Sequence, residues 1–278
     1  MRRLLPLLAA AAARRRAPAP ATRAKNASWP TPVVVVPAVY REWRGAPPWA
    51  DKLPRTASVF AYQRLDPAAP RYCPNHGFEA GVHLRFIVDH YDCLPDVALF
   101  TQANPTEHAR NFFKEVRCLD ANVTYRSVDS NFMARGTSYW RRRHLDGVVE
   151  QCWRDVLRVF GVAAEPKREP RIAAYAAAQF AASRGAIRRH PRSAWERAYA
   201  MLGGARACHP GPLDFDELHA PPSRQRDSGK LNRHTAGAWE HLNHVIVGGQ
   251  PLLGAKRPRA KDPGDCPGGP WPPSDRCR

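Results

Sequence analysis

Residues 75–102 read NHGFEAGVHLRFIVDHYDCLPDVALFTQ, and this stretch decides the fold that we expect. It begins with a polar turn that contains a glycine, and residues 79–91 follow with apolar side chains at helical spacing. After a Leu-Pro-Asp break, the apolar run at residues 97–100 predicts a buried strand that ends in the polar pair Thr101 and Gln102. Because open α/β sheets bind ligands beyond the carboxyl ends of their strands, we expect a ligand site there.

The rest of the chain alternates strand and helix patterns early and shows mainly helix patterns late. The β-branched run at residues 33–36 predicts a fully buried first strand, and residues 57–62 predict a second short strand. Apolar spacing predicts further helices at residues 107–116, 141–160, 172–187, 191–202 and 235–247. This order predicts an α/β fold, with a single domain, a parallel or mixed sheet and a helical C-terminal half.

The two ends of the chain have compositions that do not suit a folded core. Residues 1–30 contain no acid and place an apolar run of ten residues after Arg2 and Arg3, which predicts a disordered signal or transit peptide. The run is shorter than the roughly 20 residues of a membrane span, and no other segment suits one. Residues 251–278 are rich in Pro, Gly and basic residues and predict a disordered tail. The α/β domain is therefore expected at residues 31–250.

Cysteines and glycosylation sequons favour the secretory pathway. Seven cysteines are many for a cytosolic protein, and Cys152 is expected in the core because it lies on the apolar face of a helix. Asn26 and Asn122 begin acceptor sequons for N-glycosylation, whereas Pro105 excludes the one at Asn104. A mitochondrion or plastid is the alternative location, because three arginines follow the first apolar run.

The basic excess is large and diffuse. The formal charge is +18, from 43 basic and 25 acidic residues. Arginine far outnumbers lysine, and alanine, proline and glycine are abundant, as expected of a GC-rich coding sequence. Because no recognised nucleic-acid-binding motif accompanies the charge, we expect no nucleic-acid partner.

Four blocks of motifs follow one another across most of the chain. They are residues 33–41 with 60–64, residues 75–79, residues 91–96 with 100–102, and residues 179–191 with 240–248. In order and spacing these blocks resemble an uncharacterised family, a domain of unknown function, with Asn-x-Gly-x-Glu, Tyr-Asp-x-Leu-Pro-Asp, Phe-x-Gln and Gln-Phe-x-x-Ser-Arg motifs. Three positions depart from that pattern: Phe78 replaces an Arg, Ala103 a Gly and Asn243 a Trp.

The family is remotely similar to the nucleotide-sugar glycosyltransferases. The resemblance implies the nucleotide-sugar transferase fold, a nucleotide sugar as donor and a glycan as acceptor. It also implies a mechanism that stabilises the leaving diphosphate electrostatically. The alternative is a non-catalytic carbohydrate- or nucleotide-binding module on the same scaffold.

The turn at residues 75–79 carries the first candidate residues. Asn75 and Gly77 could expose backbone N–H groups to a diphosphate at the start of a helix, or form a plain capping turn. Glu79 is a candidate general base or ribose contact. Arg184 and Arg188, four residues apart, are candidate phosphate ligands, with a solvated basic face as the alternative.

The remaining candidates lie later in the chain. Gln102 ends a strand where a donor sugar would lie, and Glu240 and His244 share a helix face as a candidate acid/base pair. A metal-dependent transferase would place an Asp-x-Asp pair near that strand end, and this chain does not. Asp214 and Asp216 form its Asp-x-Asp motif, which is either a Mn²⁺ or Mg²⁺ site or a solvated loop. Metal independence and loss of catalysis are therefore both open hypotheses.

Overall fold

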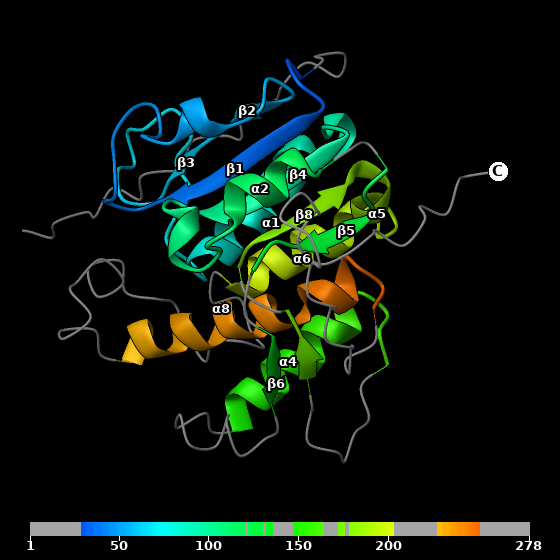
Figure 1. Cartoon of the computed structure of the whole chain (residues 1–278). Helices are drawn as coiled ribbons and strands as arrows, with labels where there is room; N and C mark the ends of the chain where they lie inside the picture. The colour runs from blue at the N-terminus through cyan, green and yellow to red at the C-terminus, as the bar shows by residue number, and fades with distance from the viewer. Residues whose placement is uncertain are drawn as a thin grey trace, which may run out of the picture.

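The structure is a computed structural model, and it describes residues 29–119, 122–129, 132–135, 147–163, 172–175, 178–202 and 227–250. Its central element is a mixed sheet in the spatial order β2–β1–β4–β8–β5, and β3 also pairs with β1 (Figure 1). The strands of this sheet are β1 (Val33–Val39), β2 (Ala57–Val59), β3 (Tyr62–Gln63), β4 (Val97–Gln102), β5 (Tyr125–Ser127) and β8 (Phe180–Ser183). The α/β fold and the mixed sheet that the sequence predicts are thus confirmed.

The strand directions define where a ligand site is expected. Strands β2, β3 and β4 run parallel to β1, whereas β8 runs antiparallel to both β4 and β5. The chain leaves β1 toward β2 and leaves β4 toward the other side of the sheet. In open α/β sheets, such diverging connections leave a crevice beyond the carboxyl ends of the two strands. Here these ends are Val39 and Gln102, and we call this side of the sheet the carboxyl edge.

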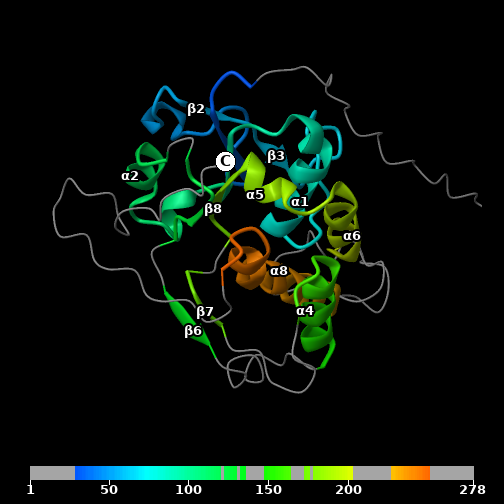
Figure 2. The same cartoon turned by 90° about the vertical axis from the view of Figure 1, so that its right-hand side faces the viewer.

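Two hydrophobic clusters cover the two faces of the sheet, because successive side chains of a strand point to opposite faces. Val34 of β1 and Phe100 of β4 belong to one cluster, and Val35 and Leu99 belong to the other. The first cluster is completed by α1 (Glu79–His90), α4 (Gly147–Val159), α6 (Arg192–Leu202) and α8 (Asp227–Ile246). The second is completed by Trp49 and α2 (Phe112–Arg117), and Figure 2 shows α2 on the opposite side of the strands from α1 and α6.

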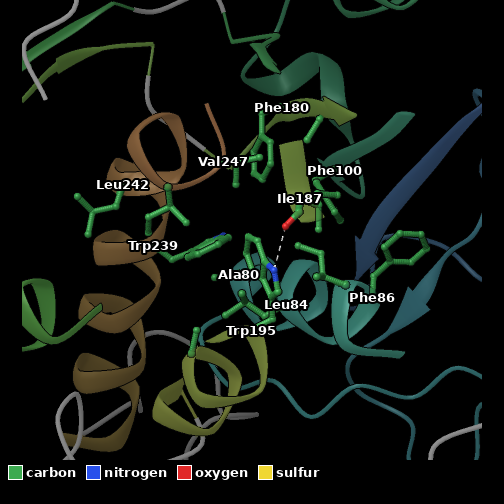
Figure 3. Packing of buried hydrophobic residues seen from close by; sticks show 14 of the residues in the cluster. Ala80, Leu84, Phe86, Phe100, Phe180, Ile187, Trp195, Trp239, Leu242 and Val247 are labelled. Carbon is green, nitrogen blue, oxygen red and sulfur yellow. Dashed lines mark hydrogen bonds between the residues drawn. The ribbon is translucent and has the colours of Figure 1, made fainter. Parts of the chain in front are cut away.

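Aromatic side chains hold the helices of the first cluster together. The ring centroids of Trp195 on α6 and Trp239 on α8 lie 6.0 Å apart, and both residues are almost fully buried (Figure 3). Trp195 Nε1 donates a hydrogen bond of 3.2 Å to the carbonyl oxygen of Ile187. Tyr125 of β5 donates a hydrogen bond of 2.6 Å to Asn243 of α8, so this helix is tied directly to the sheet.

The prediction of a helix over residues 172–187 is wrong. This segment forms β7 (Ile172–Ala174), β8 (Phe180–Ser183) and the short helix α5 (Arg184–Arg188). Strand β7 pairs with β6 (Met133–Arg135), and β8 is hydrogen-bonded between β4 and β5. The alanines of β8 are good helix formers, but pairing on both sides outweighs that weak local preference. The C-terminal half is therefore not simply helical.

The other helical predictions need smaller corrections. The helix predicted at residues 107–116 is a 3₁₀ turn, η3 (Pro105–Glu107), followed by α2, and α8 begins at Asp227 rather than near residue 235. Two further 3₁₀ turns are η1 (Ala50–Lys52) and η2 (Tyr91–Cys93). Cys152 is buried as predicted, but it is disulfide-bonded, as is Cys118. No helix within the described ranges is long and apolar enough to span a membrane. Residues 1–28 and 251–278 lie outside the described residues.

Candidate functional site

The turn before α1 has an unusual backbone. Gly77 has φ +68° and Phe78 has φ +51° with ψ −123°. The Ala80 N–H donates a hydrogen bond of 3.0 Å to the Gly77 carbonyl oxygen, which closes a tight turn around Phe78. A positive φ is rare and costly for a residue with a side chain, and such conformations gather at functional sites. Phe78 is also the N-cap residue of α1, and its own side chain makes no capping hydrogen bond.

Asn75 contributes to this turn through its contact with Arg64. Its side-chain oxygen accepts a hydrogen bond of 2.8 Å from Arg64 Nη1, and both residues are buried. Arg64 Nη2 lies 3.2 Å from Glu79 Oε1 and forms an ion pair with that carboxylate. Arg64 follows directly after β3, so the ion pair connects the carboxyl edge of the sheet to the first turn of α1. Two predicted site residues, Asn75 and Glu79, therefore meet at one arginine that the sequence did not single out.

Glu240 of α8 approaches the same group from another part of the chain. Partial burial of its carboxyl, and then the negative charges of Glu79 and Asp129, raise the pKa of Glu240 to about 8. Within the described part of the chain, no hydrogen bond or ion pair joins Glu240 to another residue. A half-buried carboxyl whose pKa is raised by its neighbours is a typical feature of functional sites. Glu79, Asp129 and Glu240 are called the carboxylate group below.

Asp129 is a site residue that the sequence analysis missed. It lies two residues beyond the end of β5, at the carboxyl edge, and it is buried. The Gln179 backbone N–H donates to Asp129 Oδ2 at 3.4 Å, and Gln179 Nε2 donates to Asp129 Oδ1 at 3.4 Å and to the Pro105 carbonyl oxygen at 3.0 Å. Gln179 is fully buried, and its Oε1 has no hydrogen-bond partner among the described residues. A polar residue shortly after a strand was the signal, but the three residues of β5 are too few to show a pattern.

A cavity of about 840 Å³ lies at the carboxyl ends of β1 and β3. Its wall carries aromatic and cationic side chains, with Asp66 as an acid among them. Their arrangement offers ring surfaces together with positive charge. The lining includes Tyr40, Arg41, Trp43, Arg44, Tyr62 and Arg71.

Arg64 connects the wall of this cavity to Glu79. Gln63 and Leu65, its two neighbours in the chain, both line the cavity. Arg64 instead reaches Asn75 and Glu79, and its guanidinium carbon lies 5.5 Å from the centroid of the Tyr40 ring, which also lines the cavity. One cation thus contacts both the cavity wall and the first carboxylate.

The other predicted site residues occupy different places. Gln102 ends β4 at the carboxyl edge and is half-buried, while His244 is enclosed in the core one turn after Glu240. Arg184 and Arg188 follow the end of β8 that lies beside Val97, the first residue of β4, and hence at the opposite edge of the sheet.

Both arginines hold the segment that leads into β4. Arg184 forms an ion pair with Asp96 and donates to the Leu94 carbonyl oxygen, and Arg188 donates to the carbonyl oxygens of Tyr91 and Asp92. The structure therefore does not bring Arg184 and Arg188 together with Asn75 and Glu79.

The described residues give little support for a metal site. Among these residues, no group of three or more His, Cys, Asp or Glu side chains is arranged to hold a metal ion. Asp214 and Asp216, the predicted Mn²⁺ or Mg²⁺ ligands, lie outside the described residues.

The fold and the site define an open-sheet α/β protein with a cationic cavity and a group of carboxylates at the carboxyl edge of its sheet. The chain belongs to a family described as "Protein of unknown function (DUF3431)", whose model matches residues 34–253. This match confirms the membership of an uncharacterised family that the motif blocks predict. Comparisons with curated proteins and with solved structures gave no match.

Proposed function

We propose that this protein is a glycosyltransferase-like enzyme that uses a nucleotide sugar as donor and a glycan as acceptor. One observation carries the proposal: Glu79 and Asp129, from distant parts of the chain, act electrostatically on Glu240, and Arg64 joins Glu79 to Tyr40 on the wall of a cationic cavity. The position at the carboxyl edge supports it, because ligands of open α/β sheets bind there.

The cavity suits the donor. Its volume of about 840 Å³ lies in the range of small-molecule sites in proteins. Arg41, Arg44 and Arg71 are exposed on its wall, and guanidinium groups bind diphosphates with paired hydrogen bonds. The rings of Tyr40 and Trp43 offer apolar surface for a nucleobase. As the sugar transfers, the same arginines would stabilise the negative charge that develops on the leaving diphosphate.

Glu240 suits the proton transfer. In glycosyl transfer an acceptor hydroxyl attacks the anomeric carbon of the donor and loses its proton to a base. A catalytic base works best when its pKa lies near the working pH, and the pKa of Glu240 is about 8. Deprotonated Glu240 would accept the hydroxyl proton, while burial and then the charges of Glu79, held by Arg64, and Asp129 keep its pKa high.

The disulfides support a secretory location. Cys118 and Cys152 are disulfide-bonded, and such bonds persist mainly in oxidising compartments. The secretory pathway is also where the glycan acceptors of such an enzyme would be found. A mitochondrial or plastid location remains the alternative proposal.

A second candidate function is a non-catalytic carbohydrate- or nucleotide-binding module. Its support is the end of β4, where Thr101, Gln102 and Asn104 stand in place of an acidic pair that could bind a metal with the donor diphosphate. Phe78, in a strained conformation, also stands where the family resemblance implies an arginine. A binding module would keep the cavity and need no proton transfer.

The test measures binding and transfer on matched variants of the full chain. Melting temperatures would be recorded against a panel of nucleotide sugars, with and without Mn²⁺, and release of the nucleoside diphosphate would be followed with glycan acceptors. Arg44→Ala should abolish the stabilisation by the donor. Arg55→Ala should preserve it, because this exposed arginine precedes β2 at the opposite edge of the sheet.

Glu240→Gln separates the two candidate functions. For a transferase it should retain donor binding and lose transfer, typically by a factor of about 10²–10⁴. Wild-type protein that binds a donor without transferring it would favour the binding module. Folded wild-type protein that no nucleotide sugar stabilises would contradict both.

A further inference from the structure

Asn122 lies on the surface in the turn that leads into β5. It is exposed, the next residue, Val123, is buried in the second hydrophobic cluster, and Thr124 is exposed again. The Thr124 carbonyl oxygen accepts a hydrogen bond of 2.9 Å from the Ser183 N–H, which holds this turn against the end of β8. The asparagine and the threonine of the sequon Asn122-Val123-Thr124 thus both face solvent on an anchored segment.

A neighbouring cysteine indicates the compartment in which this segment folds. Cys118 lies four residues before Asn122 and is disulfide-bonded. Disulfides form mainly in the secretory pathway, and N-glycans are attached to Asn-x-Ser/Thr sequons of proteins that enter it. The sequon and the disulfide are independent features, and they indicate the same environment for one stretch of chain.

We propose that Asn122 carries an N-linked oligosaccharide. The donor is a lipid-linked oligosaccharide diphosphate, and a membrane-bound transferase of the secretory pathway catalyses the step. Asn122 Nδ2 forms a bond to the anomeric carbon of the oligosaccharide and loses one proton to a base of that transferase. The bond between the anomeric carbon and the diphosphate breaks, and the lipid diphosphate leaves with the bonding electrons.

A glycan on Asn122 would not obstruct the candidate site. Strand β5 points in the same direction as β4, since both run antiparallel to β8, so Asn122 precedes β5 at the edge opposite to the cavity. Strand β5 is also the end strand of the sheet that lies farthest from β2 and β3 (Figure 1). Asn104 makes the contrast: it follows β4 at the carboxyl edge, where a glycan would crowd the site, and Pro105 blocks its sequon.

The experiment uses the full chain with its own N-terminus, expressed in a eukaryotic cell with a secretory pathway. A peptide N-glycosidase removes the glycan and converts the modified asparagine to aspartate. Performed in heavy-oxygen water, this reaction labels the residue for peptide mass spectrometry. The variants are Asn122→Gln and Thr124→Ala, which destroy the sequon, and Thr124→Ser, which preserves it.

The expected result is a labelled aspartate at position 122 in the wild type and in Thr124→Ser, and loss of one glycan-sized mobility shift in the other two variants. An unmodified Asn122 in the wild type overturns the inference, whether the chain stays outside the secretory pathway or enters it without modification at this residue. The inference shares only the secretory location with the proposed function. Glycosylated protein that no nucleotide sugar stabilises would contradict the transferase alone.

Discussion

Arg64 Nη2 lies 3.2 Å from Glu79 Oε1, so an ion pair joins the residue after β3 to the first turn of α1. Arg64 is buried and also holds Asn75 and faces the ring of Tyr40. Three segments of the candidate site therefore depend on one guanidinium group. Loss of this group would deprive Asn75 and Glu79 of a hydrogen-bond donor and a positive charge.

Replacement of Arg64 by Met should destabilise the protein. Breaking a buried ion pair by removal of one partner costs about 3–5 kcal/mol, and we expect the lower part of that range because Glu79 retains some access to solvent. Urea unfolding would measure the change. The control is Arg192→Met, whose ion pairs with Asp92 and Glu196 are exposed and should contribute at most about 1 kcal/mol. Equal effects of the two substitutions would contradict the central role of Arg64.

Glu240 should make the protein less stable as the pH rises. Its pKa is about 8 in the folded protein against an ordinary value of 4.5, so between these pH values the folded state binds more protons than the unfolded state. The free energy of unfolding therefore falls as the pH rises through this window. We expect a fall of about 1 kcal/mol or more, since one pKa unit corresponds to about 1.4 kcal/mol and solvent screens a half-buried carboxyl.

The variant Glu240→Gln should remove most of that pH dependence. Chemical unfolding at pH 5 and at about pH 8 would show a smaller difference for the variant than for the wild type. If Glu240 is the catalytic base, transfer by the wild type should rise with pH up to about 8, where the carboxyl loses its proton. A transfer rate that falls over the same range would exclude this role.

His83 should make the protein less stable as the pH falls, whereas Glu240 does so as the pH rises. Both of its ring nitrogens are buried and have no hydrogen-bond partner within the described part of the chain, and the ring contacts those of Phe100 and Phe180. Burial, and then the positive charge of Arg64, lower the pKa of His83 to about 3. Between pH 3 and 6.5 the unfolded state therefore binds more protons, and stability falls as the pH falls through this window. His83→Leu should unfold at a lower pH than the wild type in an acid titration followed by circular dichroism, and an unchanged midpoint would contradict this.

Phe78 offers a test of backbone strain. Glycine adopts a positive φ without the steric cost that other residues pay. Phe78→Gly and Phe78→Ala both remove the ring, so their difference reports the backbone alone. We expect the glycine variant to be more stable than the alanine variant by about 1 kcal/mol, the reverse of the order in ordinary helices and strands. Thermal unfolding of the pair would measure it, and greater stability of the alanine variant would refute the positive φ.

Much of the sheet follows from local patterns in the sequence. The run at residues 33–36 and the run at residues 97–100 are β1 and β4, because long apolar runs bounded by turn residues can only be buried. The Asn-x-Gly-x-Glu turn also leads into α1 as predicted. Gln102 was within reach of sequence reasoning because polar residues at the ends of such strands meet at one edge of the sheet, and Glu79 because it follows the turn that begins α1.

The contacts between distant segments could not be derived in this way. Strand β8 has the composition of a helix and becomes a strand because β4 and β5 offer it hydrogen bonds on both sides. Asn243 stands where the family pattern has a Trp, and it accepts the hydrogen bond of Tyr125 that ties α8 to the sheet.

The sequence by itself determined the fold class, the family and the segments that lie at the carboxyl edge, because these depend on local hydrophobic patterns and motif spacing. Only the tertiary structure decided that Arg64 pairs with Glu79 and that burial, then the charges of Glu79 and Asp129, raise the pKa of Glu240. Both effects depend on burial and on distances between charges, which arise from the packing of α8 and α1 on the sheet rather than from positions along the chain.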